Sequence, residues 1–279
     1  MSATSTARTA LPGVLRLGLA RTGYEVRTFF RERDAVVFIF AYPIIMLAIF
    51  ATVFGQDGAT VGPAPGIPFA QYFLPGMLAT GIMLSSFQSL AITIAVERDD
   101  GGLKRLHGTP LPPAAYFLGR TGQVLVTSLV QTALLLAAAA LVFDVPMPST
   151  AGAWTTFAWV FVLGTTAGTL CGVAFSSVPR SGKSASAVVT PIVLVLQFIS
   201  GVFFVYNDLP TWMQHVASVF PLKWMAQGMR SVFLPPSAES WEVSGSWQHG
   251  ATALVLVVWA VAALVVGIRT FRWQRRDDG

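Results

Sequence analysis

The sequence predicts an all-α membrane protein with six transmembrane helices. Three observations lead to this prediction. The chain is 54% hydrophobic and only 11% charged, whereas a soluble domain has about 25% charged residues. It contains six apolar stretches of about 20 residues, the length that crosses a hydrocarbon core of about 30 Å. Its basic residues also gather in alternate segments between those stretches.

The charge distribution predicts the orientation of the spans. With both chain ends inside, 16 of the 18 Lys and Arg residues fall inside, and only Lys223 and Arg230 fall outside. This asymmetry predicts a multi-pass protein of the plasma membrane, the inner membrane in a bacterium, with both termini cytoplasmic. Anionic membrane lipid accounts for the basic charge, so no nucleic-acid partner is expected. The predicted spans cover residues 35–54, 72–96, 121–143, 154–178, 185–206 and 250–268.

The terminal segments are predicted to lie in the cytoplasm. Residues 1–34 form a tail that includes an amphipathic helix in the membrane interface, and residues 271–279 form a second tail. The helix is indicated by apolar side chains at roughly helical spacing, with Arg residues between them. A disordered basic tail is the alternative, but the aromatic pair beside the first span favours the helix. The apolar positions are Leu15, Leu19, Val26, Phe29 and Phe30.

The link between spans two and three, "ERDDGGLKRLHGTP" at residues 97–110, is unusually polar. Each charge at mid-bilayer would cost about 2.5–3.5 kcal/mol, so the link lies outside the hydrocarbon. Gly101 permits a sharp turn, and Pro110 stops a helix that begins there. Between them, Leu103 and Leu106 share one face of a short surface helix and are free to insert into another surface. A solvated loop is the alternative.

The segment 207–240, before the last span, is too long for a plain connection. Its apolar residues predict two short amphipathic helices, broken at Pro221, that dip into the outer interface as a re-entrant hairpin anchored by tryptophan. In the fourth span, Gly164, Gly168 and Gly172 repeat a G-x-x-x-G spacing, which predicts a helix-packing face.

Two motifs resemble the ABC-2 family of transporter permeases, of the daunorubicin-resistance and polysaccharide-export type. The stretch "ERDDGGLKRLHGTPLPPAAYFLGR" resembles the signature of that family, although Lys104 replaces an acidic residue. Downstream, "SGVFFVYNDLPTWMQHVASVFPLKWMAQGMR" resembles a second family motif, with Val205 in place of a proline. In the re-entrant segment we single out Pro210, Trp212, Pro221, Trp224 and Arg230.

The resemblance implies the membrane subunit of an ATP-binding cassette exporter for a drug, lipid or glycan-type substrate. Such a permease pairs with a second copy or a paralogue and with two ATPase subunits, which bind ATP and Mg²⁺. This chain would then bind no cofactor or metal and would not be an enzyme by itself. Residues 97–110 would act as a coupling helix. The double variant Leu103→Asp and Leu106→Asp should then insert into the membrane but uncouple ATP hydrolysis from export. The implied ATPase contacts are Glu97, Arg98, Gly101, Leu103, Lys104, Arg105, Leu106, Thr109 and Pro110.

The resemblance also implies that the second and fifth spans line the translocation path. Polar residues within spans face other helices or water, so interhelical hydrogen bonding is the alternative for each of them. The candidate path residues are Ser85, Gln88, Ser89, Thr93, Thr190 and Gln197.

Two other classes of function stay open as alternatives. A secondary transporter driven by an ion gradient would usually carry a carboxylate inside the membrane, but every acidic residue lies at or beyond the end of a predicted span. An integral-membrane enzyme is less favoured. Gly182-Lys183-Ser184 lacks the rest of a phosphate-binding loop, and "DDGGLKR" lacks the downstream Asp pair of a phospholipid-synthesising transferase.

Overall fold

The computed structural model describes residues 13–62 and 65–273. Within them, six helices are long and apolar enough to cross a membrane, and the predicted all-α membrane fold is confirmed. The outer parts of the two predicted tails, residues 1–12 and 274–279, lie outside the described residues. The candidate spans are Val36–Phe54, Phe69–Asp99, Pro113–Val142, Ala151–Phe175, Gly182–Ile199 and His249–Thr270.

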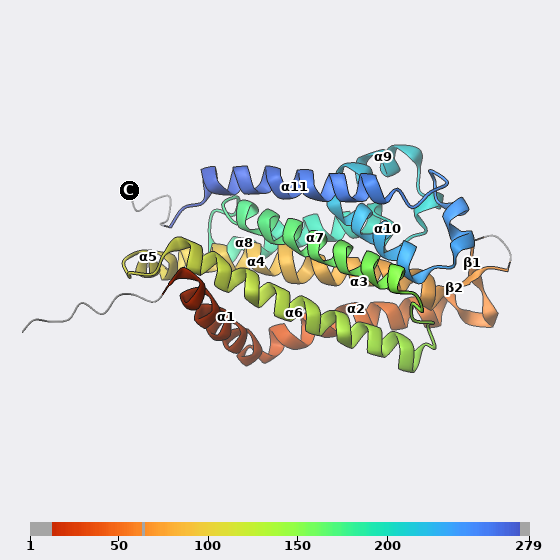
Figure 1. Ribbon diagram of the computed structural model, residues 1–279, viewed down its shortest axis with the longest axis horizontal. Helices are drawn as coiled ribbons and strands as arrows, with labels where there is room; N and C mark the ends of the chain where they lie inside the picture. Colours follow the sequence, from red (N-terminus) through yellow and green to blue (C-terminus); the bar gives the residue numbers. More distant parts are fainter. Residues whose placement is uncertain (1–12, 63–64, 274–279) are drawn as a thin grey trace, which may run out of the picture.

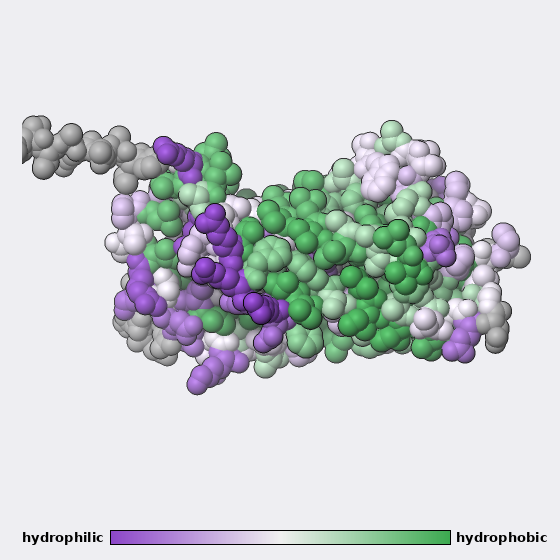
Figure 2. All heavy atoms as spheres, turned by 90° about the horizontal axis from the view of Figure 1, so that it is seen from below, coloured by the Kyte–Doolittle hydropathy of each residue, from purple (hydrophilic) through white to green (hydrophobic). Residues whose placement is uncertain are grey.

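The long helices run side by side along one axis and give the molecule two ends (Figure 1). The basic end holds α1 (Val14–Arg31), α5 (Gly102–His107) and the last turn of α11 (His249–Thr270). The hairpin end holds an antiparallel pair of short strands, β1 (Thr60–Val61) and β2 (Ile67–Pro68). A broad hydrophobic band separates the two ends, where hydrophilic side chains gather (Figure 2). Such a band suits the apolar interior of a bilayer.

The first and fourth spans, α2 (Arg33–Phe54) and α7 (Ala151–Phe175), lie close to their predicted ranges. The third span differs, because α6 (Pro113–Val142) starts before residue 121. Pro113 occupies its first position, where a missing N–H is tolerated.

The fifth span also differs, because it does not reach residue 206. The helix α8 (Gly182–Ile199) begins with a capping box between Ser181 and Ser184. After its end, Gly201 takes φ +72°, a conformation in which the chain turns away.

The second span is one helical rod in three parts: α3 (Phe69–Met83), η2 (Leu84–Gln88) and α4 (Ser89–Asp99). The middle part, η2, is a π-helical turn, in which hydrogen bonds join residues i and i+5. Side chains advance by about 100° per residue in an α-helix. The wider turn therefore rotates the side chains of α4 relative to where an unbroken α-helix would place them.

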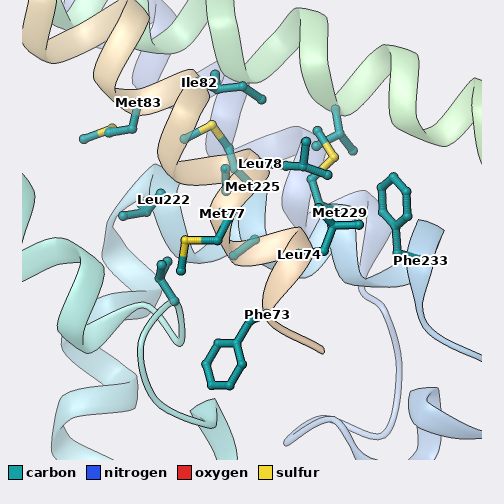
Figure 3. Packing of buried hydrophobic residues seen from close by; sticks show 14 of the residues in the cluster. Phe73, Leu74, Met77, Leu78, Ile82, Met83, Leu222, Met225, Met229 and Phe233 are labelled. Carbon is teal, nitrogen blue, oxygen red and sulfur yellow. The ribbon is translucent and has the colours of Figure 1, made fainter. Parts of the chain in front are cut away.

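The hydrophobic core lies where α3 packs against α7 and α10 (Pro221–Phe233). Figure 3 shows the side chains of α3 and α10 that meet there. Met77 of α3 and Met225 of α10 are both fully buried there. The helix α7 meets the second span through its small residues, since a Cβ at Gly168 would lie 2.0 Å from Ser86 Oγ. The predicted G-x-x-x-G packing face is therefore confirmed.

Two short helices occupy the predicted 207–240 segment at the hairpin end. They are α9 (Thr211–Val219) and α10, with the break at Pro221 as predicted. All of α10 except Ser231 is buried, so it is an interior helix of the bundle. Short 3₁₀ turns complete the connections: η1 (Gln56–Gly58), η3 (Tyr206–Asp208) and η4 (Pro236–Trp241).

The N-terminal helix is present as α1, which packs along α6. The alternative of a disordered tail is therefore excluded for this segment. Gly18 and Glu25 are buried, whereas Leu15 and Leu19 are 67% and 65% exposed. The apolar side of α1 thus faces away from the bundle, as expected for a helix that contacts lipid.

Candidate functional site

The predicted short helix between spans two and three is α5, at the basic end. Gly101, with φ +73°, allows the chain to reverse direction before it. After it, the Thr109 hydroxyl donates to the Leu106 carbonyl at 2.7 Å, next to Pro110. The helix is shorter than the predicted 97–110, because α4 continues into the first part of that range.

The apolar side of α5 faces the bundle. Leu103 is fully buried, and Leu106 is half-buried against the same cluster. The expectation that Leu103 inserts into another surface is therefore wrong, because the bundle's own core already covers it. An Asp at position 103 would place a charge in this core and damage the fold. The buried members of this α5 cluster are Leu90, Ile94, Leu103, Tyr116 and Val124.

The outward side of α5 is polar. Lys104, Arg105 and His107 are exposed, as are Thr109 and Pro110 after the helix. This surface carries two positive charges, so a complementary partner surface would be acidic.

The first two predicted ATPase contacts, Glu97 and Arg98, are half-buried and engaged within the chain. The Arg98 guanidinium donates to the Pro179 carbonyl at 3.2 Å, which ties α4 to the segment before α8. Both residues lie in the last two turns of α4, inside the bundle rather than on α5. Both residues therefore help to hold the helices together, and their predicted contact with an ATPase stays a prediction.

A buried ion cluster joins three helices close to α5. Arg120 of α6 places Nη1 2.8 Å from Glu25 Oε2 of α1, and its Nη2 contacts Glu97 Oε1 of α4. Arg21 also pairs with Glu25. The Tyr116 hydroxyl donates to Glu97 Oε2 at 2.9 Å. The Arg120 and Glu25 side chains are only 6% and 3% exposed, so this pair is shielded from water.

Burial is the largest influence on Glu25 and raises the pKa of its carboxyl, while Arg120 and Arg21 act in the opposite direction. A buried charge is tolerated when it is paired, and this cluster pairs Glu25 with both Arg120 and Arg21. Because its members come from α1, α4 and α6, the cluster fixes the helices that surround α5.

Sequence reasoning misses this ion cluster. The sequence shows Arg120 only at the end of a family motif, and Arg21 and Glu25 only as charges of the N-terminal segment. A signal is present all the same: Gly18, Arg21, Thr22 and Glu25 recur at spacings of three, one and three, which marks a single helix face.

The segment after α11 reaches back to α5. The Trp273 ring stacks on His107 with centroids 5.4 Å apart, and Phe271 meets Phe117 edge-on at 5.0 Å. Trp273 and Phe271 both pack against the α5 cluster. As a result, α5 is joined to the sixth span as well as to the second and third.

Five of the six candidate path residues line one cavity. This cavity, of about 520 Å³, lies between α2, the second span and α8. We call it the polar cavity because seven of its fourteen lining residues are polar, although apolar side chains form most of its surface. The Tyr42 hydroxyl donates to Gln197 Oε1 at 2.8 Å, and Gln88 Nε2 lies 3.5 Å from Thr190 Oγ1. Polar groups from the second and fifth spans thus meet here. The five residues are Gln88, Ser89, Thr93, Thr190 and Gln197.

The sixth residue, Ser85, does not line this cavity, so the prediction that it lies beside the other five is wrong. It is 2% exposed, shares a hydrogen bond of 2.7 Å with Ser128 of α6, and donates to the Gly81 carbonyl at 2.8 Å. Ser85 thus serves interhelical hydrogen bonding, the alternative interpretation. The cause is η2, whose wider turn breaks the regular spacing that linked Ser85 to the later residues.

The tryptophans of the 207–240 segment differ in exposure. Pro210 and Pro221 stand at the starts of α9 and α10. Trp212 is 64% exposed, but Trp224 is only 8% exposed. The expectation that Trp224 anchors the segment in an interface is wrong, because its indole N–H donates to the Ser218 carbonyl at 2.7 Å inside the protein.

Two cations are buried in α10. Arg230 pairs with Glu242, whose Oε1 lies 2.7 Å from its Nε. Lys223, 5% exposed, donates to Gln227 Oε1 and lies 3.5 Å from the centroid of a Trp224 ring. Burial and the like charge of Arg230 lower the pKa of Lys223 to about 8.

Comparison with known proteins identifies the family. The model of the ABC-2 type transporter family matches residues 19–234, a range that contains α5, the ion cluster and α10. The inner membrane transport permease YadH of Escherichia coli K12 is 23% identical over 193 residues, which cover 69% of this chain and 74% of that protein. YadH of Shigella flexneri gives the same values. The chain therefore belongs to the ABC-2 type transporter family and is a multi-pass membrane transport permease.

Proposed function

We propose that this permease is the membrane subunit of an ATP-driven exporter that moves a drug, lipid or glycan-type substrate outward. A second copy or a paralogue would complete the path. Two separate ABC ATPase subunits would bind ATP and Mg²⁺ and supply the energy. The chain would lie in the inner membrane of a bacterium, the location that the name of YadH gives for that protein.

The observation that carries this proposal is the construction of α5. Its outward side is polar and exposed, while its inward side is part of a core shared with spans two, three and six. A six-residue helix held in this way cannot move without the bundle. Rigid elements of this kind transmit rigid-body displacements, so a force applied to α5 would reach three spans.

The charge distribution supports an orientation with the basic end in the cytoplasm. Sixteen of the 18 Lys and Arg residues belong to segments that the positive-inside rule assigns to one side. This orientation places α5 where a cytoplasmic ATPase could contact it.

The carboxylates argue against an ion-gradient mechanism. Within the described residues, Glu97 and Asp99 are the acidic residues that fall inside a candidate span, and both lie at its end. Glu97 is also engaged with Arg120. A coupling carboxylate near the middle of a span would be expected for that class.

The test uses the outward side of α5. The double variant Lys104→Glu and Arg105→Glu reverses two exposed charges without touching the buried Leu103. We expect co-purification with the co-expressed ATPase to fall by about tenfold, a loss of about 1.4 kcal/mol, while the gel-filtration profile of the permease stays unchanged.

Arg269→Glu is the matched control, because Arg269 is also exposed at the basic end but belongs to α11. It should leave ATPase capture unchanged. Full ATPase capture by the α5 double variant would overturn the assignment of α5 as the contact.

A further inference from the structure

Two cavities lie along the same face of the molecule. The polar cavity uses the first part of α2, the second span around η2, and α8. A second cavity, of about 430 Å³, uses the end of α2, the start of α3 and the segment after α8. The helix α2 and the second span therefore line both cavities, and the third side is α8 in one and the segment after α8 in the other. Along α2, Tyr42 and Phe54 are separated by about 18 Å at 1.5 Å per residue, so the cavities lie toward opposite ends.

The second cavity is aromatic. Five of the residues that line it are phenylalanines: Phe54, Phe69, Phe73, Phe203 and Phe204. Three of these rings form a stacked series. Phe69 lies 5.9 Å from Phe54 and 5.8 Å from Phe73, both measured between ring centroids. The face of an aromatic ring carries partial negative charge and attracts a cation within about 6 Å of its centroid.

The charged residue that lines each cavity is acidic. Asp208 lines the aromatic cavity and Glu32 lines the polar cavity, and no Lys or Arg among the described residues lines either one. Neither carboxylate forms an ion pair or a side-chain hydrogen bond with the rest of the described chain. The chain as a whole carries an excess of basic residues, 18 against 13 acidic, so the charge of this face is opposite to that of the chain.

These features select one class of ligand. An anionic ligand would meet aromatic faces and carboxylates with no cation to pair with. A sugar would find Asp208 as the charged partner for its hydroxyls and otherwise phenylalanine, valine and leucine side chains in the aromatic cavity, and unpaired hydroxyls are costly to bury. A cation with a large apolar body would gain cation–π attraction, apolar burial and a carboxylate.

We infer that the face between α2 and α8 binds lipophilic organic cations, with the aromatic cavity and Asp208 as the principal site. This inference rests on the proposed function, since it narrows the class of cargo. Glu32 contributes less than Asp208, because Arg31 and Arg33 flank it in the chain and oppose its charge.

The test compares two ions of equal shape and opposite charge. Tetraphenylphosphonium and tetraphenylborate are offered separately to the full-length permease in lipid nanodiscs, and binding is measured by equilibrium dialysis against empty nanodiscs. We expect the cation to bind at least about tenfold more tightly than the anion. Asp208→Asn should weaken cation binding about tenfold, and Glu32→Gln only two- to threefold.

Two further variants make the result specific. Phe204→Leu keeps an apolar side chain at a half-exposed position but removes the ring face, and it should weaken cation binding severalfold. Asp144→Asn is the control, because Asp144 lines neither cavity and Asn tolerates its φ of +51°. It should leave binding unchanged.

Equal binding of the two ions, or unchanged cation binding by Asp208→Asn, would overturn the inference. No ATPase is present in this assay. Cation binding without ATPase capture would overturn the proposed function but not this inference. ATPase capture without preference for the cation would overturn this inference but not the proposed function.

Discussion

At the basic end, the single guanidinium of Arg120 serves two carboxylates, those of Glu25 and Glu97. Arg21 supplies a second cation for Glu25, so cations and carboxylates are equal in number there. The hairpin end has two buried cations and one carboxylate: Glu242 pairs with Arg230, while Lys223 has an amide and the rings of Trp224 and Tyr206 as neighbours. One cluster joins three helices that are distant in sequence. The other lies within one stretch of sequence, from Tyr206 of η3 through α10 to Glu242 after η4.

The difference shows that buried charges stabilise the fold at one end and destabilise it at the other. Balanced pairing at the basic end holds α1, α4 and α6 together around α5. At the hairpin end, an incompletely paired cation is held by surrounding packing, and its desolvation opposes folding. We therefore expect removal of a charge to be harmful at the first site and tolerated or favourable at the second.

The largest effect is expected for Arg120→Met. This change would leave Glu25 buried with only Arg21 and would free Glu97 from its cation. Breaking a buried pair from one side costs about 3–5 kcal/mol, so the free energy of unfolding in detergent should fall by about that amount. The exposed Arg27 on the same helix as Glu25 supplies the control, and Arg27→Met should change stability by less than about 0.5 kcal/mol. Equal stability of the two variants would show that the ion pairs of Arg120 do not stabilise the fold.

A smaller effect of opposite sign is expected for Lys223→Met. The pKa of Lys223 is about 8 in the folded protein and 10.5 in its unperturbed state. Between these values the unfolded chain binds more protons, so the stability of the natural protein rises with pH. The variant lacks this dependence. It should be more stable below pH 8, by at most about 3 kcal/mol at ~1.36 kcal/mol per pKa unit, and should lose that advantage by pH 10.5.

The measurement for Lys223→Met is a series of denaturation curves from pH 7 to 10.5. Lys183→Met is the control, because Lys183 is exposed near the start of α8 and its replacement should change stability by less than about 0.5 kcal/mol. A constant difference between the variant and the natural protein across this range would show that Lys223 is not destabilised by burial.

The smallest effect concerns backbone geometry at the basic end, where no buried charge is involved. Gly101 has φ +73° and nothing within 4 Å of a Cβ, so Gly101→Ala should cost about 1 kcal/mol through backbone strain alone. Gly108, at the other end of α5, has φ −75° and space for a Cβ. Gly108→Ala should therefore be nearly neutral. Thermal unfolding of the two variants side by side separates strain at the turn from general sensitivity of α5.

The six spans could be predicted because apolar length and charge asymmetry are properties of single segments. The direction of Leu103 could not. Two leucines three residues apart define an apolar side of α5, but the same pattern results whether that side meets the bundle or a partner. The structure decides this through residues distant in sequence, such as Tyr116 of α6 and Trp273 after α11, which lie in the same cluster as Leu103.

The cavity-lining residues could be predicted only in part, because the sequence shows which residues are polar but not how the helix turns between them. The polar residues of the second span stand out in the sequence, but grouping them assumes an unbroken period of 3.6 residues. The π-helical turn at Leu84–Gln88 changes that period and separates Ser85 from Gln88. The partnership of Glu25 with Arg120 joins residues 95 positions apart in sequence, so no local pattern could reveal it.

The stacking of Trp273 on His107 connects the last span to α5. Because the rings of Phe271 and Trp273 lie in the same core as Leu103, a displacement of α5 would displace the end of α11 together with α4 and α6. The core around α5 thus includes residues that follow the final transmembrane helix.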